Sequence, residues 1–310
     1  MQNNSNKNKY LLTVIIPFYN IGNQFNKCIK RLNNIRDERL EIIFVDDGST
    51  KNLNNKYFLH IQKRENYKLI KLNKNKGPGV ARNNGIKFSK GEFLIFLDSD
   101  DKLKHKNLIK LLDYLEREKN REIIFFNYFK KKNRYKINLS KKKIEKYKII
   151  KLFLRTELEM CSNFYCFKKN FLTKYKIKFS SGYYEDIVFM LKNFYYMRRF
   201  HLFKLVIYEK IDNKKSITNT YSKKHLLDFL RSVKMKVNFF KQKIKKNNLV
   251  NDLQFGLRGD YIFSKKISNN YDKFKSSHFF IDNFFKKIIS KEFKVITSYD
   301  KKVLKELFYK

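Results

Sequence analysis

Cysteine is scarce in this chain of 310 residues. The three cysteines, Cys28, Cys161 and Cys166, have neither the number nor the spacing of a disulfide framework or of a zinc site. We expect them to be reduced thiols, as in cytosolic proteins. The five histidines are scattered without ligand spacing, so we assign them no metal-binding chemistry either.

Long hydrophobic runs are also missing. No window approaches the ~18 uninterrupted apolar residues of a membrane span. Residues 1–9 are polar and rich in asparagine, and they lack the apolar core of a secretory signal. We therefore expect a cytoplasmic protein that can meet a membrane only as a peripheral protein, on the inner face of the cell membrane.

Acidic residues are few compared with basic ones. The 71 Lys and Arg against 29 Asp and Glu give a formal net charge of +42. Such an excess favours contact with polyanions, either nucleic acid or an anionic membrane face. The lysines are also accompanied by abundant Asn, Ile, Phe and Tyr, which an AT-rich genome would produce through codon bias alone. Both explanations stay open.

The first hundred residues lack two common phosphate-binding motifs. Apolar runs at 11–16, 41–45, 68–72 and 93–97 alternate with helical patterns at 23–34 and 80–90, which predicts a parallel sheet with helices on both faces. Neither a Gly-x-Gly-x-x-Gly turn nor a Walker lysine motif is present, which disfavours a dehydrogenase or a P-loop ATPase. A metal ion held by carboxylates is therefore the remaining candidate for binding phosphates.

Three aspartates follow directly after the predicted strand 93–97. Open α/β sheets bind ligands at the carboxyl ends of their strands, and Asp98 and Asp100 offer the hard oxygen ligands that Mg²⁺ or Mn²⁺ prefers. The alternative is a solvated turn, or an N-cap for a helix that starts after Lys104. We expect Asp101 to be only an acid at the start of that helix.

A second acidic pair opens a later helix. Glu185 and Asp186 precede an apolar helical pattern that runs to about residue 196. Acids in a first helical turn are favoured by the helix dipole, which is an alternative to a functional role. Between the two acidic sites, the patterns predict helices at 107–118 and 170–175, strands at 122–129 and 163–167, and a lysine-rich exposed loop with the start of a helix at 130–148.

The chain changes character after residue 222. A stripe of apolar residues with spacings of four and three predicts an amphipathic helix, and further helices are expected at 280–289 and 303–308. We therefore expect one domain at 1–222 and a basic helical extension at 223–310, whose helices either pack on the domain or lie on an anionic membrane surface. The stripe consists of Leu226, Leu230, Val233, Val237, Phe240 and Ile244.

Five segments in order resemble the inverting glycosyltransferases of family two, of the bacterial surface-polysaccharide type. They are residues 14–20, 45–50, 79–86, 96–101 and 184–186. Each match is weak alone, but their order between residues 12 and 190 is specific. The resemblance implies a GT-A type fold, a nucleotide-binding α/β/α sandwich, with a mainly helical C-terminal extension.

The resemblance also implies how a nucleotide would be bound. Asp47 would accept a hydrogen bond from the imide N–H of a uracil-like base, with Asp46 supporting the turn. Pro17 and Tyr19 would shape the pocket for base and ribose, and Arg82 would add a guanidinium contact to the nucleotide. These residues predict a nucleotide-sugar donor, most simply a UDP-sugar.

The same resemblance assigns the chemical step. Asp98 would hold the ribose hydroxyls or a metal-bound water, and Asp100 would ligate the Mn²⁺ or Mg²⁺ that bridges the two phosphates. Asp186 would be the general base that deprotonates the acceptor hydroxyl, and Glu185 would orient the acceptor. A single displacement with one base inverts the anomeric centre.

A later segment, residues 213–219, resembles a loop that closes over the donor diphosphate. Related sequences frequently have an arginine or histidine just before its Ser-Ile-Thr, where this chain has Lys214 and Lys215. Lysine offers a point charge without the bidentate geometry of arginine.

The prediction is a metal-dependent, hexosyltransferase-like enzyme that acts on a glycan or a lipid-linked glycan in the synthesis of surface polysaccharide or lipopolysaccharide. The alternative is a basic nucleic-acid-binding protein on an α/β scaffold, which the charge favours. The acids gathered at one sheet edge oppose it, because they would repel phosphates unless a metal intervened.

Overall fold

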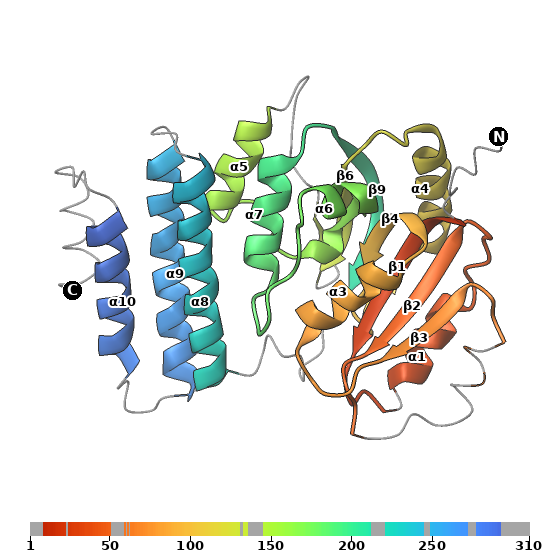
Figure 1. Cartoon of the computed structure of the whole chain (residues 1–310), viewed down its shortest axis with the longest axis horizontal. Coiled ribbons are helices and arrows are strands. Elements are labelled where there is room, and N and C mark those ends of the chain that lie inside the picture. The colour runs from red at the N-terminus through yellow and green to blue at the C-terminus, as the bar shows by residue number, and fades with distance from the viewer. Residues whose placement is uncertain are drawn as a thin grey trace, which may run out of the picture. The chain divides into compact units, whose positions relative to one another are not determined.

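The computed structural model describes residues 9–22, 24–50, 59, 61, 63–130, 133–135, 145–211, 221–244, 249–271 and 277–292. The chain forms two compact units. The first comprises Met1–Ile149 and Glu159–Asn213 and contains the sheet. The second comprises Ile150–Leu158 and Lys214–Lys310, so a short segment from the middle of the chain belongs with the C-terminal helices. Figure 1 labels the elements of both units.

Four parallel strands form one half of the sheet, in the order β3-β2-β1-β4. They are β1 (Tyr10–Phe18), β2 (Leu40–Asp46), β3 (Tyr67–Lys71) and β4 (Gly91–Phe96). β1 and β2 are buried along almost their whole length, which explains their nearly continuous apolar sequences. The predicted parallel arrangement of these four strands is confirmed.

The other half of the sheet is mixed, which the sequence did not predict. β8 (Tyr165–Lys168) pairs antiparallel with β4 and with β6 (Ile123–Lys130), and β9 (Phe200–Lys210) pairs parallel with β6. The short strands β5 (Lys102–Leu103) and β7 (Asn133–Tyr135) pair antiparallel with β9 and β6. The directions of β4, β6 and β9 therefore agree, and their carboxyl ends reach the same edge.

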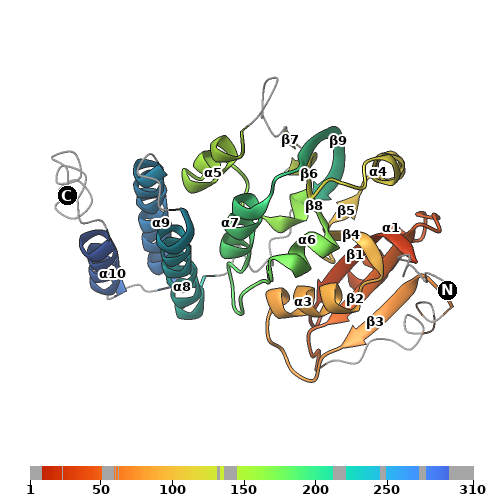
Figure 2. The ribbon, with the colours of Figure 1, turned by 45° about the horizontal axis from the view of Figure 1, so that its top comes forward.

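Helices cover both faces of the parallel strands (Figure 2). Phe25 of α1 (Gln24–Leu32) contacts Phe18 of β1. On α3 (Pro78–Phe88), Gly85 lies so close to Ile15 of β1 that a Cβ there would collide with its side chain. Phe18 and Ile15 are an odd number of residues apart on one strand, so they face opposite sides of the sheet. The predicted α/β/α sandwich is confirmed.

The remaining helices of the first unit follow the predicted patterns closely. α4 (His105–Arg117), α6 (Lys169–Lys174) and α7 (Asp186–Tyr196) occupy the predicted helical segments. The prediction of a strand over 163–167 is partly wrong, because Ser162–Phe164 forms a 3-10 turn before β8 begins. Most of the predicted loop at 130–148 and all of the segment 213–219 lie outside the described residues, and α5 is Lys146–Leu154.

The second unit is helical over its described residues. It contains α8 (Lys223–Phe239) with a π-helical end at Phe240–Ile244, α9 (Val250–Tyr271) and α10 (Ser277–Glu292). The predicted apolar stripe from Leu226 to Ile244 is buried. α9 was not predicted, and a fully buried Lys236–Asp260 ion pair ties it to α8. The expected helix at 303–308 lies outside the described residues, and none of the described helices is long and apolar enough to cross a membrane.

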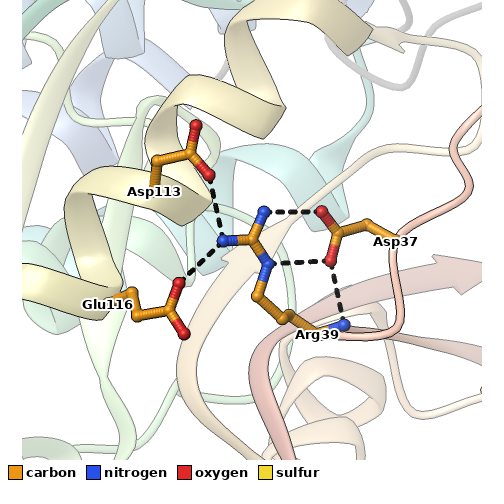
Figure 3. Close-up of polar contacts among 4 residues, drawn as sticks. All are labelled: Asp37, Arg39, Asp113 and Glu116. Atoms are coloured by element: carbon orange, nitrogen blue, oxygen red, sulfur yellow. Dashed lines mark hydrogen bonds and ion pairs between the residues drawn. The ribbon is translucent and has the colours of Figure 1, made fainter.

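An arginine network marks the amino-terminal edge of the sheet (Figure 3). Arg39 donates to Asp37 and also to Asp113 and Glu116 of α4, with N–O distances of 2.7 to 3.0 Å. A hollow of about 970 Å³ lies at this edge, and its lining includes Arg36, Arg39, Asp37 and Glu65. Because its positive and negative charges nearly balance, this hollow favours no charged ligand. At the carboxyl edge of the sheet, by contrast, the turns after β2 and β4 carry several aspartates.

Candidate active site

Every predicted site residue lies in the first unit, at the carboxyl ends of β1 and β2, in the loops that follow the strands, or in α3 and the start of α7. β2 ends in the acidic turn at Asp46, β4 leads into the loop that carries Asp98, and α7 begins with Asp186. Parallel strands bring these segments to one edge although they are far apart in sequence.

The acidic turn after β2 is fixed by its own carboxylates. Asp46 Oδ1 accepts a hydrogen bond from the Ser49 amide at 2.8 Å. Asp47 accepts from the amides of Lys76 and Gly77, at 3.0 and 2.7 Å, and burial raises its pKa against these bonds. Gly48 has a positive φ of 73°, and a Cβ there would collide with the Lys74 backbone. The turn is therefore held against the loop that precedes α3, a contact that the sequence did not reveal.

Pro17 and Tyr19 lie beside this turn. Pro17 pairs in register with Val45 at the ends of β1 and β2, and the side chain of Tyr19 is 42% exposed. Asn20 connects the two turns, because its amide donates to Ser49 Oγ at 2.9 Å and its Oδ1 accepts from the Thr50 amide at 3.0 Å. The base-and-ribose pocket predicted for Pro17 and Tyr19 stays a prediction.

Arg82 joins the two acidic motifs. Its side chain, 5% exposed, donates to Asp98 Oδ1 at 2.9 Å and forms a short ion pair with Glu185 Oε1. Burial acts to lower the pKa of Arg82, but the carboxylates of Asp186, Glu185 and Asp98 outweigh it and raise the pKa. The guanidinium thus bridges the loop after β4 and the start of α7. The nucleotide contact predicted for Arg82 stays a prediction.

Burial shifts the pKa values of both acids of the pair, Glu185 and Asp186, upward. Burial raises the pKa of Glu185 to about 7, against the lowering effect of Arg82. Burial also raises the pKa of Asp186, again partly offset by Arg82. Asp186 Oδ1 is buried and has no hydrogen-bond partner among the described residues. Tyr184, just before the pair, has a positive φ of 60°, which is uncommon outside glycine.

A helix-capping role does not account for the pair. Glu185 occupies the N-cap position of α7, yet its side chain makes no capping hydrogen bond and pairs with Arg82 instead. Asp186 does lie in the first turn, where the dipole favours an acid, but a cap would not require a buried, unpartnered oxygen.

The loop after β4 presents Asp98 and Asp100. The Asp98 side chain is 31% exposed, and although burial opposes ionisation, Arg82 and then Lys210 lower its pKa. Arg31 of α1 fixes the loop by donating to the Asp100 carbonyl at 2.6 Å. The alternative N-cap role is wrong, because Lys104 is the N-cap of α4 and makes no side-chain capping bond.

Within the described residues, no cluster of three or more His, Cys, Asp and Glu side chains is arranged to hold a metal. Asp98 and Asp100 still fit Mg²⁺ or Mn²⁺ bound with a diphosphate, because such ions take only one or two carboxylates beside substrate phosphates.

Asp101 has a different place from the one predicted. It is buried and is not part of α4. Its Oδ2 accepts a short hydrogen bond from the Tyr208 hydroxyl, and its Oδ1 accepts from the Ile211 amide at 2.7 Å. Burial, and then Asp98, raise its pKa to about 7. The prediction that Asp101 is an acid at the helix start is wrong, and its contacts hold the end of β9 against the acidic loop.

Asp101→Asn should therefore lower the free energy of unfolding by about 1–3 kcal/mol. The amide group can accept from only one of the two donors, and its NH₂ would face the other. Urea unfolding of the variant measures the change. Asp100→Asn, in the same loop but half-exposed, is the matched control, and an equal loss in both variants would contradict the anchoring role of Asp101.

Several residues near the acids were missed by sequence reasoning. Tyr208 of β9 contacts Asp101 and accepts from Asn163 Nδ2 at 3.0 Å and from the Asp98 amide at 3.3 Å. Asp98, Asp101 and Asp100 act to raise the pKa of Lys210 against the effect of burial. Cys161 lies close to Asp186 and Lys210. No motif marks these positions, although recognising β9 as a strand would have pointed to Tyr208 and Lys210.

Comparison with known proteins adds independent information on this edge. A family model described as "Glycosyl transferase family 2" matches residues 13–183. Poly(ribitol-phosphate) beta-N-acetylglucosaminyltransferase TarP of Staphylococcus aureus (strain N315) is 32% identical over 181 residues, which are 55% of this chain and 52% of TarP. Across the curated relatives compared, the matched stretches cover 15% to 52% of the relative's length.

Solved structures share the architecture. S. aureus TarS 1-349 in complex with UDP has a TM-score of 0.59 at 19% identity, and the match covers 83% of this chain and 74% of that one. The mannosyltransferase PcManGT from Pyrobaculum calidifontis, in complex with GDP-Man and Mn²⁺, has a TM-score of 0.54 at 12% identity, with 98% and 86% covered. At such identities the likeness shows the fold, which is GT-A.

Proposed function

The chain belongs to glycosyl transferase family 2, and from this premise we propose that it transfers a sugar from a UDP-sugar to a hydroxyl of a glycan or lipid-linked glycan, with inversion. The observation that carries the proposal is the Arg82 bridge, in which one buried guanidinium holds both Asp98 of the donor loop and Glu185 of the acceptor pair. A displacement reaction needs these two sides to be adjacent.

The donor side is proposed to consist of Pro17, Tyr19, Asp46 and Asp47 around the base and ribose. The half-buried loop with Asp98 and Asp100 is proposed to face the diphosphate. A divalent cation, Mn²⁺ or Mg²⁺, bound by these two aspartates would stabilise the charge that develops on the departing nucleoside diphosphate. TarS binds UDP on the same fold, and the mannosyltransferase was solved with Mn²⁺, which supports this assignment.

The acceptor side is proposed to centre on Asp186. Its buried Oδ1, without a described partner, is free to accept the proton of an acceptor hydroxyl, while Glu185 stays paired with Arg82 and orients the acceptor. Because burial raises the pKa of Asp186, this carboxylate is a stronger base than an exposed aspartate.

For the biological substrate we propose a cell-surface polymer. TarP acts on poly(ribitol-phosphate), and the notable positive charge of +42 suits a polyanionic polymer. Surface polysaccharide and lipopolysaccharide remain within this class. We propose that the enzyme works in the cytoplasm, peripherally on the inner face of the membrane.

UDP together with Mn²⁺ should stabilise the chain against heat. At a UDP concentration of 100 times Kd, the gain in free energy of unfolding is about 2.7 kcal/mol, which raises the Tm by several degrees. Asp100→Ala should lose the part of the shift that depends on Mn²⁺. A thermal-shift assay with UDP, with Mn²⁺ and with both measures this.

The nucleic-acid alternative is tested in the same samples. Salt-sensitive retention on single-stranded or double-stranded DNA, together with no thermal shift by UDP, GDP or their Mn²⁺ complexes, would replace the transferase proposal with that alternative.

A further inference from the structure

Four aromatic rings form a continuous row at the carboxyl edge of the sheet. Tyr135 of β7 stacks on Tyr128 of β6 with ring centroids 5.3 Å apart and planes 4° from parallel. Tyr128 stacks on Phe164 at 3.7 Å, and Phe164 meets the edge of Tyr208 at 5.2 Å. Phe164 and Tyr208 are fully buried, Tyr128 is nearly so, and Tyr135 is 40% exposed. The row therefore ends in one open ring, Tyr135, which stacks on Tyr128.

The inner end of this row touches the acidic loop. Tyr208 donates to Asp101 and accepts from the Asp98 amide. Residues 159–163 connect the middle of the row with the acceptor pair: Glu159 contacts Tyr128, and Ser162 lies beside Asp186. The row starts within the proposed site and leads away from it.

Polar groups flank the outer rings. Glu159 Oε2 accepts from the Tyr128 hydroxyl at 3.4 Å and pairs with Lys130 Nζ at 3.3 Å. Both charged side chains remain partly exposed. Next to Tyr128, the ring on which Tyr135 stacks, there are thus a carboxylate and an ammonium that can still meet hydroxyl groups.

We propose that Tyr135, backed by Tyr128, is the platform on which a pyranose ring of the acceptor glycan stacks, with Glu159 and Lys130 bonding its hydroxyls. The proposal rests on the transferase function proposed above. A sugar ring combines an apolar C–H face with a rim of hydroxyls, and a flat ring beside hydrogen-bonding groups matches both. A ring held by Tyr128 is also already ordered before the sugar binds, which reduces the entropy lost on binding.

Packing alone explains this row incompletely. The three inner rings fill the space between β6, the 3-10 turn at Ser162–Phe164 and β9, so their stacking stabilises the sheet. Tyr135 lies at the end of the row and keeps 40% of its surface exposed, so packing against Tyr128 leaves part of the ring open. An open aromatic face that continues an active-site row is what an acceptor subsite needs.

The test is ligand-observed saturation-transfer NMR on the full chain in the presence of UDP and Mn²⁺. The probes are the methyl glycosides of glucose, galactose and N-acetylglucosamine. At least one should receive saturation on the C–H protons of one ring face. Tyr135→Ala should raise its Kd about fivefold or more, whereas Tyr135→Phe should keep binding because the ring remains. Tyr147→Ala, at a tyrosine of α5 that is 41% exposed, is the matched control and should bind like the wild type.

The outcomes separate the two proposals. Glycoside binding that is unchanged in Tyr135→Ala, or no binding of any probe to a wild type that does bind UDP, would overturn the subsite. A wild type that fails to bind UDP would instead overturn the transferase function. Tyr135→Ala should also leave the thermal shift by UDP intact, since the ring is placed on the acceptor side.

Discussion

Asp186→Asn is expected to lower the rate of sugar transfer by about two orders of magnitude or more while the chain stays folded. The amide of Asn has nearly the shape of the carboxylate but cannot take the proton of an acceptor hydroxyl. The buried Oδ1 of Asp186 has no described hydrogen-bond partner, so the substitution breaks no hydrogen bond at this oxygen. Transfer is measured with the donor identified by screening UDP-sugars for metal-dependent hydrolysis.

The control for this variant separates chemistry from binding. The thermal shift caused by UDP and Mn²⁺ should be the same in Asp186→Asn and in the wild type, because the donor side is unchanged. Asp113→Asn removes an exposed carboxylate at the opposite edge, beside Arg39, and should keep normal transfer. Turnover near the wild-type level in Asp186→Asn would refute the role of this residue as the base.

The order of elements up to β4 could be predicted because local sequence determines it. Strands such as β1 and β2 are buried on both faces, so nearly all of their residues are apolar. A short continuous apolar run of this kind is itself an indication of a buried strand. β9 was missed for the opposite reason, because most of its residues are only partly buried and its sequence mixes lysines with apolar residues. β9 is stabilised by pairing with β6, which is far away in sequence. The sequence of neither segment alone indicates that the two will pair.

In the candidate site, too, the features that local sequence determines could be predicted and those that depend on distant residues could not. The acidic motifs at Asp98 and Asp186 could be found because an apolar strand pattern precedes the first and an apolar helical pattern follows the second. Arg82 was expected to contact a nucleotide. The structure shows that its guanidinium bridges Asp98 Oδ1 and Glu185 Oε1, which belong to two motifs far apart in sequence. Asp101 was predicted to be an acid at the start of a helix, because nothing near it in sequence indicates its contact with Tyr208. Local sequence patterns do not predict polar contacts between residues that are far apart in the chain.

Arg82→Met should be the most destabilising of these substitutions. Removing the guanidinium leaves Asp98, Glu185 and Asp186 close together without a buried counter-charge, and breaking such a buried pair costs about 3–5 kcal/mol. The cost should be larger at pH 8 than at pH 5.5. The pKa of Glu185 is already raised to about 7, so at the lower pH this acid is protonated and one of the repelling charges is gone. Urea unfolding at both pH values measures the difference.

Arg39→Met is the matched control, because Arg39 also pairs with three carboxylates but is 25% exposed at the amino-terminal edge (Figure 3). Its loss should cost about 1 kcal/mol or less, since water screens those charges. Arg82 lowers the pKa of both Glu185 and Asp186, so any transfer that survives in Arg82→Met should need a higher pH than in the wild type. Equal destabilisation by the two substitutions, with an unchanged pH profile of transfer, would mean that the ion pairs of Arg82 contribute no more than exposed ones. A large cost with a shifted profile would identify it as the residue that positions the acids for catalysis.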